Sequence, residues 1–502
     1  MKKQLFASSA FRFLENIIMV AISLLLTPYF IDTLGKADYG LWLLTLSILG
    51  WFNVIDLGFP AAVQRSITIA LEKADDKQVN TVFSTSIVLF GGLGLFSAGS
   101  LLIIANYPSL FGVEGDSMTP FTYALMILAI KVVWDFLMNA FNGFFAGMLR
   151  YDIDANISTL NSLIKALLVY LLIPQMNIFG AVLATLAADF ISNVLKVYYA
   201  KKLYKPLKFS RELVSVAELK DLFNFSKHVI TGGIARAINN NSAPILVTKL
   251  FELTLVPIYS IANRLATLTE GFASSITGIF QPIFTRMVTR NADMEKMFID
   301  VTTINITVYS ILYQLLLIFG GSFIILWVGE DFTESIFLMN ILAFSFLCRA
   351  LSWSIKGVLL AQANHKFIAL TNLFGALINI VSSIILSQYF GIMGIAIGCC
   401  IGFFVTDCIL NMLLVKKYND FNLLPIVKSF LVAVTITYLI TRFGQHVIME
   451  QVGNSWFMLV VYGLLIFPCV IVINWLLILN KDMKRKSLDI VLSKLPLLKP
   501  SR

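Results

Sequence analysis

The feature that most constrains this chain is a succession of apolar blocks, each about twenty residues or longer, separated by short polar breaks. Such a block, folded as a helix, crosses the roughly 30 Å hydrocarbon core of a bilayer. The 502 residues are 58% hydrophobic and 13% charged, which excludes a soluble globular protein. We predict an all-α polytopic membrane protein with about 14 transmembrane helices. The predicted spans are residues 10–33, 39–70, 81–105, 119–149, 153–172, 178–201, 226–250, 254–289, 303–328, 336–361, 367–386, 392–415, 424–441 and 456–479.

Positive charge is concentrated in alternate loops of this pattern. Lys73, Arg150, Lys208 and Arg290 lie in such loops, whereas the intervening loops carry acids such as Glu114. By the positive-inside rule both termini face the cytoplasm, which requires an even number of crossings. Membrane orientation also accounts for the net charge of +9, so no nucleic-acid partner is expected.

The spans divide into two sets of six, followed by two more. Asp32 and Tyr39 recur as Glu252 and Tyr259 at an offset of 220 residues, which indicates an internal repeat. Transporters are commonly built from such repeats. We predict an N-terminal six-helix bundle (1–201), a cytoplasmic amphipathic linker (202–223), a C-terminal six-helix bundle (224–417), helices 13 and 14 (418–480) and a basic cytoplasmic tail (481–502).

The span 226–250 is poorly suited to lipid, because Arg236 and three consecutive asparagines lie near its middle. At helical spacing Gly233, Arg236 and Asn240 share one face. An arginine at mid-bilayer costs roughly 2.5–3.5 kcal/mol, so this face must look into a bundle or a wet cavity. Arg236 and Asn240 are therefore candidate substrate-binding residues.

Other bases also lie deep within predicted spans. Arg264 shares a helical face with Thr267, and Arg349 shares one with Ser352 and Lys356. Arginine presents a planar fork of donors that suits a compact anion with several acceptor oxygens, and lysine adds a point charge. Arg264, Arg349 and Lys356 therefore join the candidates for substrate binding.

Together Arg236, Arg264 and Arg349 form a predicted clamp for an anionic group of the substrate. The alternative role of each is an interhelical salt bridge, and Glu270 is one partner considered for Arg264. Arg12 is a further substrate-binding candidate near the cytoplasmic end of the first span, where its alternative is to extend toward lipid headgroups.

Acidic side chains occur at depth as well. Asp56, Glu270 and Asp189 are candidates for ion coupling, because a buried carboxylate can change charge during a transport cycle. Lys131 and Asp135 are four residues apart, and we expect them to pair on their own helix.

Signatures of an enzyme are missing from the sequence. A Walker A loop is absent, and the predicted outer loops are too short to carry the catalytic acids of a polytopic glycosyltransferase. The five cysteines lie in apolar spans without metal-ligand spacing. We expect no enzymatic activity, no cofactor and no metal.

Two motifs carry a family resemblance. The stretch from Leu34 to Trp42 (LGKADYGLW) and the stretch from Asp56 to Arg65 (DLGFPAAVQR) resemble the polysaccharide-biosynthesis or oligosaccharide-flippase family of the multidrug/oligosaccharidyl-lipid/polysaccharide (MOP) exporter superfamily. The resemblance implies two six-helix bundles related by pseudo-two-fold symmetry around a central cavity. It also implies a flippase of the bacterial cytoplasmic membrane that moves a polyprenyl-pyrophosphate-linked oligosaccharide repeat unit from the inner to the outer leaflet for surface polysaccharide synthesis, such as O-antigen, capsule or exopolysaccharide.

The implied partners are this lipid-linked oligosaccharide, membrane lipid, a polysaccharide polymerase and glycosyltransferases. Three alternatives stay open. Two come from the same superfamily, an ion-coupled multidrug and toxin antiporter and a lipid II flippase. The third is a membrane scaffold protein, for which a charged interior has no evident purpose.

Overall fold

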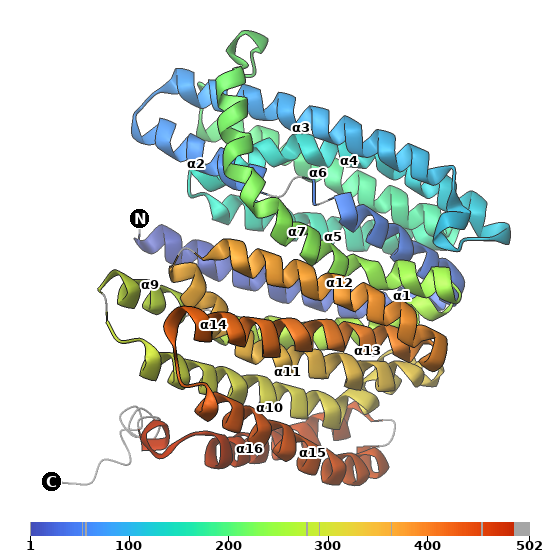
Figure 1. Cartoon of the computed structure of the whole chain (residues 1–502). Coiled ribbons are helices and arrows are strands. Elements are labelled where there is room, and N and C mark those ends of the chain that lie inside the picture. Colours follow the sequence, from blue (N-terminus) through green and yellow to red (C-terminus); the bar gives the residue numbers. More distant parts are fainter. Residues whose placement is uncertain are drawn as a thin grey trace. The chain divides into compact units, whose positions relative to one another are not determined.

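The computed structural model describes residues 2–52, 54–55, 58–277, 280–290, 292–362, 364–452 and 455–485, and the regular structure of these residues is entirely helical (Figure 1). The chain divides into two compact units, Met1–Pro257 and Ile258–Arg502. In chain order the elements are α1 (Lys2–Phe52), α2 (Phe59–Glu72), α3 (Asp76–Ala105), η1 (Pro108–Phe111), η2 (Gly115–Ser117), α4 (Met118–Gly147), α5 (Tyr151–Met176), α6 (Ile178–Leu203), η3 (Arg211–Leu213), α7 (Val216–Leu250), α8 (Leu255–Thr277), α9 (Gln281–Thr289), α10 (Glu295–Val328), η5 (Glu330–Phe332), α11 (Glu334–Ala361), α12 (His365–Phe390), α13 (Ile392–Phe403), η6 (Phe404–Leu410), α14 (Asn411–Asn419), α15 (Leu424–Val452) and α16 (Trp456–Ile478).

Within the described residues, 11 helices are long and apolar enough to cross a membrane. This confirms a multi-pass, all-helical membrane protein. One of these spans, Leu14–Phe52, covers most of the predicted block 10–33 and the first part of the predicted block 39–70, with a kink between them where Gly35 has φ 75° and ψ 171°. α7 and α8 are richer in polar residues and are not among the 11. The total of about 14 crossings stays a prediction.

Two predicted long helices are interrupted, so the predictions of single helices over 39–70 and 254–289 are wrong. α1 ends at Phe52 and α2 begins only at Phe59; in the same way α8 ends at Thr277 and α9 begins at Gln281. A proline occupies the first turn of both α2 and α9. Proline is tolerated at a helix start but cannot continue a helix from the preceding turn, because it lacks the amide hydrogen and its ring clashes.

The linker predicted at 202–223 is shorter in the structure. Ser215 accepts a hydrogen bond from the amide of Glu218 and caps α7, which therefore begins at Val216. α7 packs against α1, α2 and α3, which is why the first compact unit extends to Pro257. Of the predicted basic tail, the structure describes residues 481–485. The division into two functional bundles stays a prediction.

The bounds of the helices repeat between the two units. α5 and α12 each contain 26 residues, and 214 residues separate both their first and their last positions. The helix after each, α6 and α13, begins with the same separation. A Cβ on Gly180 would lie 2.5 Å from the carbonyl oxygen of Leu172, and one on Gly394 would lie 2.3 Å from that of Leu386. Each unit thus closes an equivalent hairpin on a glycine, as an internal repeat predicts.

Candidate functional site

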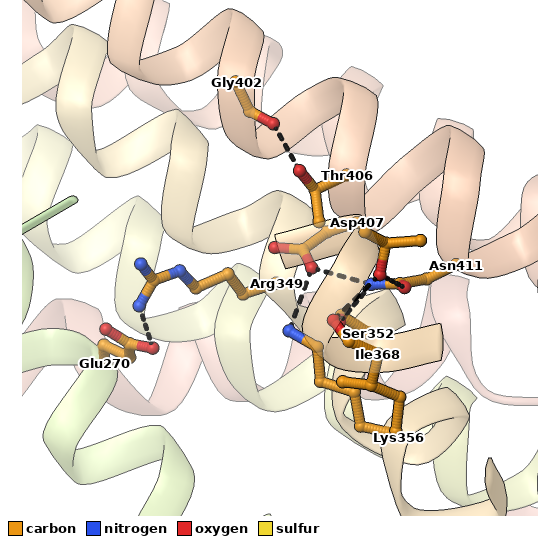
Figure 2. A network of polar contacts seen from close by, with 10 residues as sticks. Glu270, Arg349, Ser352, Lys356, Ile368, Gly402, Thr406, Asp407 and Asn411 are labelled. Atoms are coloured by element: carbon orange, nitrogen blue, oxygen red, sulfur yellow. Dashed lines mark hydrogen bonds and ion pairs between the residues drawn. The ribbon is translucent and has the colours of Figure 1, made fainter. Parts of the chain in front are cut away.

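The deep charges of the second unit gather on α8, α11 and the α13–η6–α14 segment (Figure 2). Arg349 and Lys356 lie seven residues apart on α11 and therefore on the same face, two turns from each other. Each base faces an acid from another helix. We call Arg349, Glu270, Lys356 and Asp407 the second-unit charge cluster; it contains two bases and two acids.

Arg349 contacts a carboxylate and two aromatic rings. Its Nη1 donates to Oε1 of Glu270 on α8, and both side chains are 21% exposed. The guanidinium carbon lies 4.9 Å from the ring centre of Phe346 and 3.9 Å from that of Phe403 on α13. Cation–π contacts of this kind are attractive, so the rings hold the guanidinium in place alongside the ion pair.

Lys356 pairs with a much more deeply buried acid. Its Nζ lies 3.1 Å from Oδ1 of Asp407, whose side chain is only 2% exposed. The amide of Asn411 donates to the same oxygen at 3.1 Å and lies 3.0 Å from Oγ of Ser352. Asp407 belongs to the π-helical segment η6, and such local widening of a helix is frequent at functional sites. The carboxylate is thus compensated by one charge and one amide, as a buried charge requires.

A comparable cluster lies in the first unit, on α4, α5 and α6. Lys131 pairs with Asp135, which confirms the predicted pairing on one helix. Lys131 also lies 2.9 Å from Asp189 on α6, and Lys165 of α5 lies 4.0 Å from the same acid. The amide of Asn161 donates to Asp189 at 2.7 Å. Asp189 therefore links three helices through two bases and one amide.

The remaining predicted site residues are distributed over both units. Arg236 and Asn240 on α7 belong to the first unit and are exposed, and Arg236 makes no ion pair with any residue that the structure describes. Arg264 lies half-buried on α8 in the second unit. Position 12 belongs to α1, but the side chain of Arg12 lies outside the described part, as does Asp56. The three-arginine clamp therefore stays a prediction.

Several residues of the clusters were missed by the sequence analysis. Phe346 and Phe403 are ordinary aromatic residues of apolar helices, and Asn161 gives no local signal. Asn411 follows Asp407 by four residues, which is the spacing that identified the pair Lys131 and Asp135, so this contact was accessible to the same reasoning.

The clusters present ionic and hydrogen-bonding chemistry. Among the described residues, no group of three or more His, Cys, Asp or Glu side chains could hold a metal ion. The second-unit charge cluster offers one guanidinium that lies over two aromatic rings and is bound to an acid. An anion with several oxygens can compete for that guanidinium.

The chain belongs to the polysaccharide biosynthesis protein family, which it matches over residues 5–288. Its fold is that of the MOP superfamily transporters. Both statements agree with the resemblance found in the motifs around Tyr39 and Arg65.

Two relatives cover most of this chain. A Bacillus subtilis protein named "uncharacterized membrane protein EpsK" is 23% identical over 490 residues, which cover 93% of this chain and 94% of that protein. A Shigella flexneri protein named "putative O-antigen transporter" is 22% identical over 380 residues, covering 73% and 87% of the two chains. Neither name describes an enzyme, in agreement with the prediction.

Two solved structures illustrate the shared fold. The lipid II flippase MurJ in an inward closed conformation gives a TM-score of 0.72 at 14% identity and covers 96% of this chain and 99% of that one. An inward-facing multidrug-resistance transporter of the MATE family, assigned to the MOP superfamily, gives a TM-score of 0.67 at 15% identity and covers 80% and 95%.

Proposed function

We propose that this protein is a flippase that moves a polyprenyl-pyrophosphate-linked oligosaccharide repeat unit from the inner to the outer leaflet of the bacterial cytoplasmic membrane, for the synthesis of a surface polysaccharide. The family, the name of the Shigella relative and the transporter fold support this proposal. The two predicted bundles rock in alternating access and carry the headgroup while the polyprenyl tail stays in lipid.

The observation that carries the proposal is the environment of Arg349. A guanidinium within a membrane-spanning helix is energetically costly, so such residues usually mark functional sites. This one contacts two aromatic rings and remains partly exposed. Its planar donors match the oxygens of a pyrophosphate. We propose further contacts with the same headgroup from four more residues: the exposed Arg236 and Asn240 on α7, and Arg264 and Lys356.

The orientation and partners follow from the same proposal. The alternating loop charges favour cytoplasmic termini. The flippase receives its substrate from glycosyltransferases at the inner leaflet and delivers it to a polymerase at the outer one. Consumption of the product outside, or an ion gradient acting through the deep acids, supplies direction.

Reconstitution of the full-length protein tests this function. Proteoliposomes are loaded with a labelled polyprenyl-pyrophosphate oligosaccharide, and the fraction that a membrane-impermeant glycosidase can reach is followed in time. We expect the wild-type protein to raise that fraction above its value in empty liposomes, and Arg349→Ala to abolish the increase while inserting normally. Wild-type protein that leaves the lipid-linked oligosaccharide unmoved would contradict the proposal.

The alternatives are separated in the same system. A lipid II flippase shares the pyrophosphate headgroup, so lipid II is offered in place of the oligosaccharide lipid and the rates are compared. An organic-cation antiporter is tested by efflux of a fluorescent cation driven by a proton or sodium gradient. Transport of either compound without transport of the oligosaccharide lipid would reassign the function.

A further inference from the structure

The position of Arg349 does not depend on Glu270 alone. Phe346 lies one turn before Arg349 on α11, and Phe403 approaches from α13, so the two rings that contact the guanidinium come from elements other than α8. If Glu270 withdraws, the rings still hold the cation. The guanidinium edge would then present its donors to another anion in an unchanged position.

The side chain of Glu270 is 21% exposed. The next residue, Gly271, is exposed, and a Cβ built on it would meet no atom within 4 Å. Figure 2 shows Glu270 on α8 at the edge of the cluster, with Arg349 extending toward it. The second acid of the cluster has no such access, because Asp407 is 2% exposed and accepts from Lys356 and Asn411. The two ion pairs of one cluster therefore differ in how easily an anion can displace the acid.

Further ionisable groups lie near this pair in the described part of the chain: Tyr309 of α10 near Glu270, and Asp407 and Cys399 near Arg349. Neither Tyr309 nor Cys399 supplies a positive charge, and Asp407 is already compensated by Lys356. Arg349 is thus the cation that neutralises Glu270 in the second-unit charge cluster.

From this arrangement we infer that Glu270 is an exchangeable counter-ion of Arg349. The pyrophosphate of the substrate displaces the Glu270 carboxylate from the guanidinium, and the released carboxylate binds one proton from solution. One anion replaces another beside Arg349, and the proton cancels the charge left on Glu270. Headgroup binding is thereby linked to proton uptake, because a carboxylate that has lost its counter-charge and lies beside the negative pyrophosphate favours its neutral form.

This inference rests on the proposed function, and a binding experiment separates the two. Purified full-length protein in nanodiscs is titrated with a polyprenyl pyrophosphate that lacks sugar, by calorimetry in two buffers of different ionisation enthalpy. At about pH 7 most phosphate groups are deprotonated, since their second pKa is about 6, while buried carboxyls can reach a pKa of about 8–9. The difference between the binding enthalpies observed in the two buffers, divided by the difference between their ionisation enthalpies, gives the number of protons taken up per bound ligand.

We expect the wild-type protein to take up about one proton more per bound lipid than Glu270→Gln, which keeps the shape of the side chain and cannot titrate. The variant should bind the lipid at least as tightly, because no carboxylate competes for Arg349. Glu252→Gln, at an exposed position before α8, is the matched control and should retain wild-type uptake.

Equal proton uptake by the wild-type protein and Glu270→Gln would overturn the inference, as would loss of uptake in Glu252→Gln. Binding without proton uptake in the wild-type protein would refute the exchange but leave the proposed function intact. A wild-type protein that binds no polyprenyl pyrophosphate would refute both. Thermal melting of each variant confirms that the compared proteins are folded.

Discussion

The ammonium of Lys356 lies 3.1 Å from the carboxylate of Asp407, across 51 residues of sequence, and the acid is almost completely buried. Ion pairs of this kind contribute little net stability when they are intact, because the attraction offsets the cost of removing both charges from water. Removing one partner is different, since the other is left buried and uncompensated. This asymmetry makes the pair a sensitive probe of the second unit.

We therefore expect Lys356→Met to destabilise the folded protein by about 3–5 kcal/mol. The double variant Lys356→Met/Asp407→Leu should recover most of that loss, because it leaves no uncompensated charge. The wild-type protein, the two single variants and the double variant form a double-mutant cycle. Their thermal unfolding in detergent, monitored by size-exclusion chromatography, provides the measurement. Additive losses in the double variant would show that the two side chains do not interact.

At Arg349 we expect a lysine to be a poor replacement. Arg349→Lys keeps the charge but loses the planar guanidinium that contacts Phe346 and Phe403, so headgroup affinity should fall by about tenfold, or about 1.4 kcal/mol. Binding of a polyprenyl pyrophosphate in nanodiscs measures this loss. The control is Arg290→Lys, at the exposed end of α9, which should leave affinity unchanged. Wild-type affinity in Arg349→Lys would indicate that charge alone is recognised.

Arg236 on α7 should separate transport from stability. Because its side chain is exposed and makes no ion pair within the described residues, Arg236→Ala should change the unfolding free energy by less than about 0.5 kcal/mol. Flipping in proteoliposomes should nevertheless fall by at least about tenfold if the guanidinium binds the headgroup. Lys249→Ala on the same helix serves as the comparison, since Lys249 donates to the carbonyl of Ser109 instead. Undiminished flipping would remove Arg236 from the proposed headgroup contacts.

A buried amide network should fasten the last two helices to α10. The Nε2 of Gln314 lies 3.0 Å from Oγ1 of Thr437 on α15, and Nδ2 of Asn474 on α16 donates to Oε1 of Gln314 at 2.7 Å. All three side chains are buried. Gln314→Leu removes these bonds, although Thr437 still donates to the carbonyl of Ala433 and Asn474 to that of Val470. We expect the loss to cost about 1–3 kcal/mol and to make α15 and α16 more susceptible to limited proteolysis. Cleavage at the wild-type rate would show that apolar packing alone holds these helices.

Much of the fold was accessible from local patterns. The apolar blocks identified most helices, since any segment in the bilayer core must satisfy its own backbone hydrogen bonds and a helix is the simplest way to do so. The pairing of Lys131 with Asp135 followed from their spacing on one helix. The prolines at positions 60 and 282 also indicated the breaks before α2 and α9. The sequence analysis nevertheless predicted continuous helices there, because the apolar pattern continues on both sides of each proline.

Charge composition and hydrophobic periodicity thus determined that this chain spans a membrane, that its deep bases need compensation, and that its architecture repeats. Only the tertiary structure decided which acid compensates which base. Glu270 meets Arg349 across 79 residues because α8 and α11 are rotated and shifted so that these two faces coincide. The position of Phe403 over the same guanidinium depends on a third helix. Spacing along one helix fixes the face of a residue, but the rotation and register between helices are set by the packing of all their side chains together.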